Sequence, residues 1–310
     1  MGEYREIPAE TPLHKGEREL EIEPRWLCVE TATFYPRWYP GPKADHDLVD
    51  KIRGDLAIET ITEAKKKGFQ IALVDGGSSD AFKAELVKLG VTPSPELERG
   101  MSPGRQQSFK EGSALEGVRI NNWLEPEKVS IVRDCLPAAI LPIIEGTADV
   151  VVPERDEAAW ETYPDYQVDY EKRANHLWNA ILRKHNLLPQ DAPDLDAWFG
   201  PKFWKNDPEL NALFLKQYEF EKRKLKLDQI VRPELWPNAI FLPIVAALHQ
   251  GRRVASMPVS YRHPQEQTGI ELNNPEFRRR RDVQLKNIIA STIHFIRLLE
   301  GNPKTRLMPK

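Results

Sequence analysis

The 310-residue sequence has little of several features that would assign a class directly. It contains two cysteines, Cys28 and Cys135, each inside an apolar stretch and far from the other. Such usage predicts buried thiols in a reducing compartment and excludes a disulfide framework. The net charge of -3 gives no reason to expect a nucleic-acid partner. No apolar run approaches the roughly 18 residues that a transmembrane helix needs.

The start of the chain also lacks the apolar segment of a secretory signal peptide. Residues 1–24 are polar and charged, so we predict a surface extension there and a cytoplasmic location. Nothing in the sequence indicates an oligomeric state.

Signatures of nucleotide phosphate binding are missing as well. The stretch VDGGSSD (74–80) follows an apolar run, but it forms neither a Walker loop nor a GxGxxG fingerprint. Asp75 is placed to accept hydrogen bonds from a ribose or a base, and Gly76 allows close backbone approach. The alternative is an ordinary capped turn between a strand and a helix.

What the sequence does contain is a regular alternation of strand and helix patterns. The predicted strands are 25–35, 69–77, 118–125 and 148–155, and helical spacing occupies 47–67, 81–89 and 104–117 between them. This order predicts an α/β fold with a mostly parallel central sheet. Beyond residue 155 we expect helices at 167–185, 209–226 and 238–250, a strand at 253–261, and a final helix.

Polar residues stand where the predicted strands end, which is the edge at which such sheets bind ligands. One group is Glu125-Pro126-Glu127. Two carboxylates at a strand end suit a hard divalent cation that also binds substrate phosphates. The competing interpretation is a helix that begins at Pro126, with Glu127 favourably placed near its N-terminus.

Further candidates come from arginines and from an aromatic loop. Arg105 and Arg155 are suited to pair with phosphate, and equally to be surface charges. The loop 194–204 carries Asp194 and Asp196, either of which is a candidate general base, and Trp198, a candidate sugar-stacking residue. A packed, tryptophan-rich loop is the alternative. Arg262 and His263 follow the last predicted strand.

The order of these motifs resembles the GT-A fold of family 2 glycosyltransferases, especially polyprenyl-phosphate mannosyltransferases. The resemblance spans residues 26 to 265. The motifs that carry it, in chain order, are VDGGSSD, SPGRQQSF, Glu-Pro-Glu, ADVVVPERD, RANHLWNAIL, DLDAWFGPKF and GRRVASMPVSY. The resemblance implies a three-layer, Rossmann-like sandwich with helical C-terminal additions.

The resemblance also implies roles for single residues. A nucleotide-sugar would contact Thr33, Tyr35, Asp75, Gly76, Arg105 and Arg155. The acceptor would lie near Trp198, Gly200 and Arg262, with Asp196 or Asp194 as the base. A Mg²⁺ or Mn²⁺ ion would bind Glu125 and Glu127, and also His263, which stands where mannosylglycerate synthase-like enzymes have a histidine ligand.

Two positions depart from the family pattern. Family members have Asp-x-Asp where this chain has Glu-Pro-Glu, and the extra methylene group of glutamate moves the carboxylate oxygens outward. The second aspartate of the family's VDDGSSD stretch is Gly76 here.

These observations together predict a glycosyltransferase that moves mannose or glucose from a nucleotide-diphosphate sugar, first of all GDP-mannose, to a soluble small or saccharide acceptor. We expect a catalytic domain at 25–269, with a nucleotide-binding half (25–155) and an acceptor half (156–269), followed by a C-terminal helix at 270–310. The alternatives are a sugar nucleotidyltransferase and a non-catalytic nucleotide-sugar-binding protein of the same fold.

Overall fold

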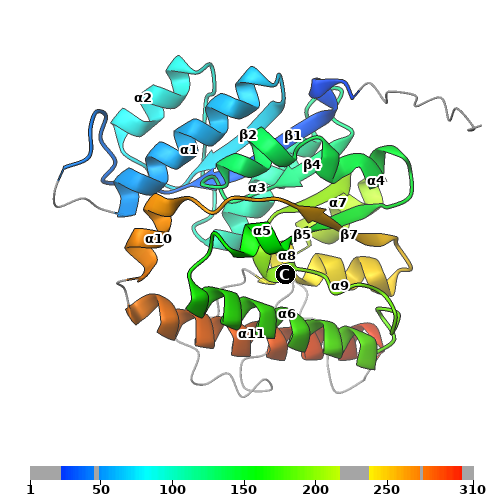
Figure 1. Cartoon of the computed structure of the whole chain (residues 1–310). Helices are drawn as coiled ribbons and strands as arrows, with labels where there is room; N and C mark the ends of the chain where they lie inside the picture. The colour runs from blue at the N-terminus through cyan, green and yellow to red at the C-terminus, as the bar shows by residue number, and fades with distance from the viewer. Residues whose placement is uncertain (1–21, 45–48, 217–236, 273–274, 302–310) are drawn as a thin grey trace, which may run out of the picture.

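The computed structural model describes residues 22–44, 49–216, 237–272 and 275–301. It contains a sheet of seven strands in the order β3-β2-β1-β4-β6-β5-β7 (Figure 1). The strands are β1 (Leu27–Thr33), β2 (Gln70–Asp75), β3 (Ser94–Pro95), β4 (Ile120–Trp123), β5 (Val150–Arg155), β6 (Lys202–Lys205) and β7 (Val254–Val259). Only β6 pairs antiparallel with its neighbours, β4 and β5. The predicted α/β fold with a mostly parallel sheet is therefore confirmed, and it agrees with the GT-A architecture that the resemblance implied.

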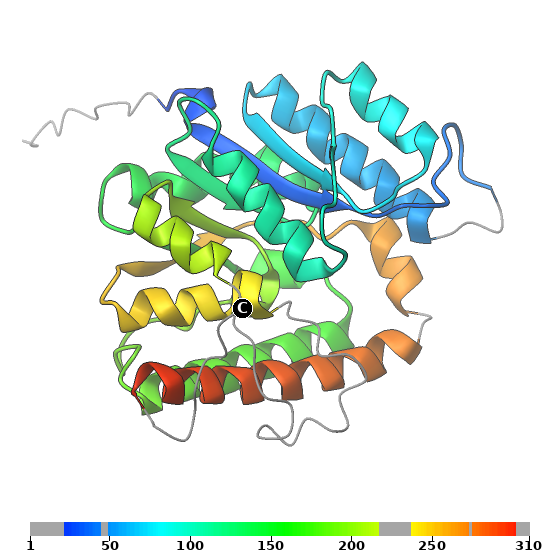
Figure 2. The same ribbon diagram turned by 180° about the vertical axis from the view of Figure 1, so that it is seen from behind.

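Helices cover both faces of this sheet and add a further layer on one side. They are α1 (Val49–Lys66), α2 (Asp80–Lys88), α3 (Met101–Ser113), α4 (Leu141–Ile144), α5 (Glu157–Trp160), α6 (Asp165–Lys184), α7 (Pro208–Leu215), α8 (Pro237–Ile240), α9 (Leu242–His249), α10 (Gln265–Leu272) and α11 (Pro275–Leu299). Both views show α6 and α11 side by side, outside the layer that contains α9 (Figures 1 and 2). No helix in the described ranges is long and apolar enough to cross a membrane.

Two apolar clusters hold these layers together. One joins α3, α7, α9 and α11 to the sheet through Phe109, Trp123, Trp204, Ile244 and Phe295. The other packs the opposite face against α1 and the irregular segment 131–144, with side chains such as Ala64, Ile131 and Ile140. Because the sheet is covered on both faces, strands β1 and β5 are buried along most of their length, which explains the apolar runs LCV and VVV with which they begin.

Several local expectations need correction. The capped turn after β2 ends at Ser79, whose hydroxyl caps α2 by accepting a hydrogen bond from the Phe82 amide. Pro126 and Glu127 lie in a turn, so Pro126 does not begin a helix. The predicted helix at 209–226 ends at Leu215, and its part from 217 on lies outside the described residues, as does most of the extension 1–24.

The division into a nucleotide half and an acceptor half is not visible as a break in the sheet. Strand β6 pairs with β4 from the first half and with β5, the last strand of that half. The domain boundaries stay predictions.

The close approach of α3 to β1 depends on a glycine. The carboxyl group of Glu30 on β1 is fully buried and faces Gly112 on α3. Burial raises the pKa of Glu30 well above its usual range. A methyl group at Gly112 would lie 2.7 Å from Cγ of Glu30, which is closer than two carbon atoms can approach.

Replacing Gly112 by alanine is therefore expected to lower the free energy of unfolding by about 1–3 kcal/mol, the usual cost of overpacking. Urea unfolding followed by circular dichroism measures it. Gly269→Ala on α10 is the control, because nothing lies within 4 Å of its added methyl group. Combining Gly112→Ala with Glu30→Ala should recover part of the loss. Equal stability of Gly112→Ala and the parent would contradict the packing described here.

Candidate functional site

Two adjoining cavities lie at the carboxyl ends of β1, β2 and β4. The first, the strand-end cavity, has a volume of about 510 Å³ and is lined by the ends of these strands, by α3 and by the segment 96–100. The second, the α6 cavity, has a volume of about 320 Å³ and is lined from α6, α8, α10 and α11 and from the loop that precedes β6. The predicted edge of the sheet is thus hollowed.

The two cavities meet at charged side chains. Five residues line both: Arg53, Met101, Arg105, Glu125 and Glu127. Arg53 comes from α1, Arg105 from the first turn of α3, and the glutamates from the connection after β4. A ligand in either cavity would therefore reach the same cations and carboxylates.

Glu125 is held close to the loop before β6. Its Oε1 lies 4.0 Å from the Arg105 guanidinium and its Oε2 lies 4.0 Å from the Lys128 ammonium. Oε2 is buried and has no hydrogen-bond partner among the described residues. Gly200 of the loop has φ +102°, and a methyl group there would lie 2.7 Å from the Glu125 carboxylate carbon. The absence of a side chain at Gly200 makes room for this carboxylate.

Glu127 is engaged by other protein groups. Its Oε1 accepts a hydrogen bond of 2.7 Å from the Tyr35 hydroxyl and pairs at 2.7 Å with Nε of Arg53. Only 3% of the side chain is exposed. Arg53 therefore already supplies the positive charge that a metal ion would bring to this oxygen.

The predicted metal ligands Glu125, Glu127 and His263 all line the α6 cavity. Within the described part of the chain, however, no three His, Cys, Asp or Glu side chains form a group that could hold a metal ion. Both ring nitrogens of His263 are buried without a hydrogen-bond partner in that part, and the ring stacks on Tyr163. Burial, with Lys128 nearby, lowers the pKa of His263 to about 3, so the imidazole is neutral at pH 7.

The residues predicted to contact the nucleotide are distributed unevenly. Thr33, Tyr35, Gly76 and Arg105 line the strand-end cavity. Asp75 does not, because its carboxylate accepts hydrogen bonds from the backbone amides of Gly77 and Ser78 in the turn after β2. The structure therefore gives Asp75 the turn-stabilising role that was the alternative interpretation.

Arg155 and Asp196 form a buried unit. The Arg155 guanidinium is fully buried and donates to both carboxylate oxygens of Asp196, at 2.7 and 2.8 Å, and to Glu171. Asp196 also accepts from the Arg155 amide and from the side chain of Asn175. It does not line either cavity, whereas Arg155 and Glu171 line the α6 cavity.

This geometry changes the predicted roles of both residues. Every Arg155 contact given above is to a protein carboxylate, and its side chain has no exposed surface. Asp196 is saturated with donors, so it has no lone pair directed at a ligand. The positions of Arg155 and Asp196 fit residues that hold the loop before β6 and α6 in place. They fit an arginine that binds the diphosphate and a general base less well.

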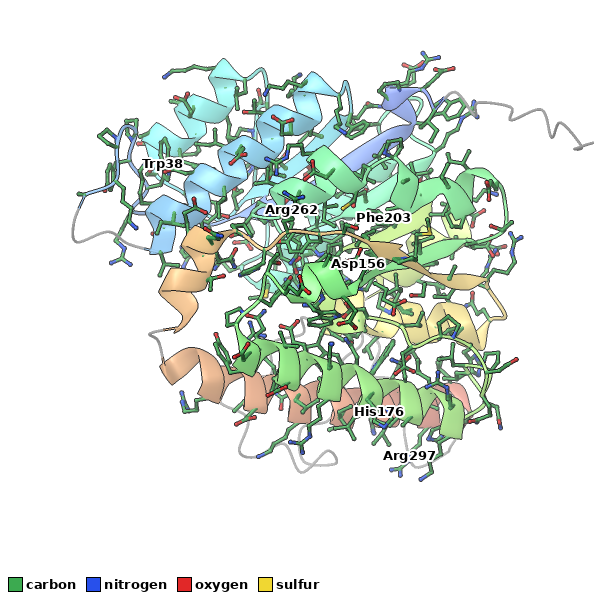
Figure 3. All side chains as sticks on the ribbon, viewed as in Figure 1. Trp38, Asp156, His176, Phe203, Arg262 and Arg297 are labelled. Carbon is green, nitrogen blue, oxygen red and sulfur yellow. The ribbon has the colours of Figure 1, made fainter. Side chains whose placement is uncertain are left out.

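Of the other residues predicted to lie near the acceptor, some line the α6 cavity and some do not. Trp198 and Gly200 line the α6 cavity, and the buried Nε1 of Trp198 has no partner among the described residues. Asp194 pairs instead with Arg183 at 2.5 Å, and it lines neither cavity. Arg262 is exposed on the connection after β7 and also lies outside both linings (Figure 3).

Sequence reasoning missed several residues of the site. Arg53 and Arg281 were unremarkable among many charged helix positions, yet Arg53 lies where the cavities meet and Arg281 pairs with Glu171 inside the α6 cavity. Lys202, which lines neither cavity but holds the loop before β6, was missed because it belongs to a strand too short to detect. Its fully buried ammonium donates to the carbonyl oxygens of Ala197, Gly200 and Pro201. Burial lowers the pKa of Lys202 to about 7.

Among solved structures, the chain is similar to glucosyl-3-phosphoglycerate synthase from Mycobacterium tuberculosis. With the form crystallised without a named ligand, the TM-score is 0.49 and the identity 12%, over 92% of this chain and 88% of that chain. With its complex of Mn²⁺, uridine diphosphate and glucosyl-3-phosphoglycerate, the TM-score is 0.49 and the identity 11%, over 90% and 81%. No family model and no curated protein matches the chain. Similarity at this level assigns neither an activity nor a ligand.

Proposed function

We propose that this chain is a glycosyltransferase that moves a hexosyl group from a nucleotide-diphosphate sugar to a small acceptor. The observation that carries the proposal is the meeting of two cavities at Arg53, Arg105, Glu125 and Glu127, at the carboxyl edge of the sheet. A transferase needs two substrate compartments joined at the reacting centre, with cations where the leaving diphosphate develops charge. The order of sequence motifs supports the same function.

The strand-end cavity suits the donor. It is the larger of the two, and Gly76 and Gly104 are among the residues that line it. A base placed at the ends of β1 and β2 would leave its diphosphate near Arg53 and Arg105, and the sugar would point toward the α6 cavity. GDP-mannose is the first donor to test and UDP-glucose the second.

The residues present fit a divalent cation held mainly by the donor's phosphates. Glu125 offers a buried carboxylate oxygen without a hydrogen-bond partner among the described residues, and neutral His263 offers the lone pair of its unprotonated ring nitrogen. Glu127, paired with Arg53, would contribute charge close to that cation. Mg²⁺ and Mn²⁺ usually complete such sites with phosphate oxygens and water. A bound cation would stabilise charge on the leaving diphosphate.

The α6 cavity suits an acceptor with negative charge. Its lining carries cationic side chains from Arg53, Arg105, Lys128 and Arg281 against carboxylates from Glu125, Glu127 and Glu171, while the charge of Arg155 in the same lining is offset by Asp196. If the attacking oxygen belongs to a phosphate or carboxylate, no base is required. That oxygen would form the bond to the anomeric carbon as the bond to the diphosphate breaks. This agrees with the engagement of Asp196 by Arg155 and Asn175.

The second candidate is a protein that binds nucleotide-sugars without transferring them. The observation that favours it is the ion pair of Arg53 with Glu127, which neutralises one of the two carboxylates of the predicted metal motif. Such a protein would bind a nucleotide diphosphate equally well with and without Mn²⁺ and would consume no donor.

Calorimetric titration with GDP, UDP and their sugars, with and without Mn²⁺, distinguishes these functions, followed by a screen of acceptors for the donor that is consumed. The transferase proposal expects binding that Mn²⁺ strengthens, and release of nucleoside diphosphate when acceptor is added. Absence of binding by every nucleotide would contradict both candidates.

Replacing Glu125 by glutamine is expected to lower metal-stimulated turnover by about a hundredfold, because it removes the negative charge from the unpartnered oxygen at the junction. Steady-state assays over a range of Mn²⁺ concentrations measure the loss, and the apparent Mn²⁺ affinity should fall with it. The control is Glu116→Gln, an exposed glutamate outside both cavities. Full turnover of Glu125→Gln would refute the role given to this residue.

A further inference from the structure

A carboxylate is built into the wall of the strand-end cavity. Glu96 directly follows β3, and its amide donates a hydrogen bond to the Asp75 carbonyl oxygen at the end of β2. Its side chain lies between two glycines. A methyl group at Gly76 would lie 3.2 Å from Oε2, and one at Gly104 would lie 3.1 Å from Oε1. Side chains at either position would press on this carboxylate.

One oxygen of this carboxylate is committed and the other is available. Oε1 accepts a hydrogen bond of 3.1 Å from the Gly100 amide, which holds the segment 96–100 in place. Oε2 has no hydrogen bond or ion pair to any other described residue. Glu96 lines the cavity, so this oxygen is available to a ligand there. Each carboxylate oxygen can accept two hydrogen bonds, so both oxygens retain capacity for a ligand.

An exposed aromatic ring stands beside this carboxylate. Phe34, directly after β1, is 64% exposed and lines the same cavity. Its ring lies 3.6 Å from the methyl position of Gly76 and 3.8 Å from that of Gly77. An exposed ring at a cavity that takes a nucleotide provides a surface on which a base can stack.

The chemistry of the bases decides which one fits an acceptor with two oxygens. Guanine presents two adjacent donors, N1–H and the 2-amino group, on its pairing edge. Uracil presents one donor, N3–H, between two carbonyl oxygens that a carboxylate repels. Adenine and cytosine each place a ring-nitrogen acceptor beside their amino group. A carboxylate therefore matches guanine alone with two hydrogen bonds.

We propose that Glu96 selects a guanine nucleotide, with both carboxylate oxygens facing N1–H and the 2-amino group while the base stacks on Phe34. This inference rests on the proposed function, because it assumes that the strand-end cavity holds the donor nucleotide. It adds the class of base and the residue that reads it.

The experiment compares the affinities of GDP, inosine diphosphate, xanthosine diphosphate and UDP by calorimetry, for the parent and for Glu96→Gln. The parent is expected to bind GDP at least about tenfold more tightly than UDP. It should bind inosine diphosphate, which lacks the 2-amino group, about tenfold more weakly than GDP.

Glu96→Gln separates recognition of the base from support of the loop, because its amide oxygen can still accept from Gly100. Its amide group presents one acceptor and one donor, the match for N1–H and the 2-carbonyl group of xanthine. The variant should lose about tenfold or more in GDP affinity and gain affinity for xanthosine diphosphate. A gain cannot arise from misfolding. Glu98→Gln, an exposed neighbour outside the cavity lining, is the matched control and should leave all four affinities unchanged.

Two results would overturn the inference. UDP binding as tight as GDP binding in the parent would contradict guanine selection while leaving the transferase proposal intact. An unchanged order of affinities in Glu96→Gln would remove Glu96 as the residue that reads the base. If no nucleoside diphosphate binds, the proposed function fails and this inference fails with it.

Discussion

Replacing Arg155 by methionine is expected to lower the free energy of unfolding by about 3–5 kcal/mol, the range seen when one partner of a buried ion pair is removed. The guanidinium has no exposed surface and hydrogen-bonds to Asp196 and Glu171. Methionine fills much of the same volume, but it removes two hydrogen bonds from the Asp196 carboxylate, which stays buried. Most of the cost is therefore that of unpaired carboxylates.

Urea unfolding at pH 7 tests this expectation. Arg262→Met is the matched control, because its side chain is exposed and the cost should stay within about 0.5 kcal/mol. Adding Asp196→Asn and Glu171→Gln to Arg155→Met should recover stability, since neutral side chains tolerate the lost charge better. A loss below about 1 kcal/mol in the single variant would contradict the buried network.

The same ion pairs make stability depend on pH, which gives a second measurement on this variant. Burial opposes ionisation of Glu171, but Arg155 and Arg281 lower its pKa from the usual 4.5 to about 2. Between pH 4.5 and about 2, Glu171 is therefore protonated in the unfolded chain but still ionised in the folded chain. The stabilisation, about 3 kcal/mol, is fully present above pH 4.5 and is lost as the pH falls toward 2. Arg155→Met should show a shallower loss over this range, because only Arg281 remains to hold Glu171 ionised.

Replacing Gly200 by alanine is expected to reduce turnover by about a hundredfold and to lower the free energy of unfolding by about 1–3 kcal/mol. The backbone at Gly200, with φ +102° and ψ -61°, is strained for any residue with a side chain. The added methyl group would also collide with the Glu125 carboxylate. Glu125 would have to leave the junction of the cavities, so catalysis should suffer more than folding.

The control isolates the collision from the backbone strain. Gly41 also has positive φ, +88°, but nothing lies within 4 Å of its added methyl group. Gly41→Ala should therefore cost stability without loss of turnover. The combination of Gly200→Ala with Glu125→Ala should unfold less readily than Gly200→Ala alone. If Gly200→Ala retains full turnover, the placement of Glu125 against this loop is wrong.

The fold was predictable because its signals are local. Strands β1, β2 and β5 contain the apolar runs LCV, IALV and VVV, and α1 ends just before Gly68, whose φ is +73°, as its sequence pattern indicated. Strand β6 was missed, since KFWK is short and begins with a lysine that would be read as exposed. Lys202 is buried only because three carbonyl oxygens of its own loop surround the ammonium. No local pattern contains that information.

The candidate site was predictable only in part, for a related reason. Residues at strand ends, such as Thr33 and Glu125, could be placed from the strands themselves. The engagement of Asp196 by Arg155 depends on a contact across 41 positions, and that of Glu127 by Tyr35 across 92. Sequence alone showed the charged groups, but not which of them neutralise one another. Arg53 reaches the site from the second turn of α1, where nothing in the sequence distinguishes it from the other charged residues of that helix.

The direction of β6 has a consequence for how acceptor choice can change. Because β6 runs against its neighbours, Lys202 at its start pairs with Trp123 at the end of β4. The segment that enters β6, and not the one that leaves it, thus reaches the cleft and carries Trp198 and Gly200 there. The strand-end cavity is lined mainly from segments that leave β1, β2, β3 and β4. Changes in the stretch between α6 and β6 would therefore alter the lining of the α6 cavity, the proposed acceptor site, and leave the residues that line the strand-end cavity in place.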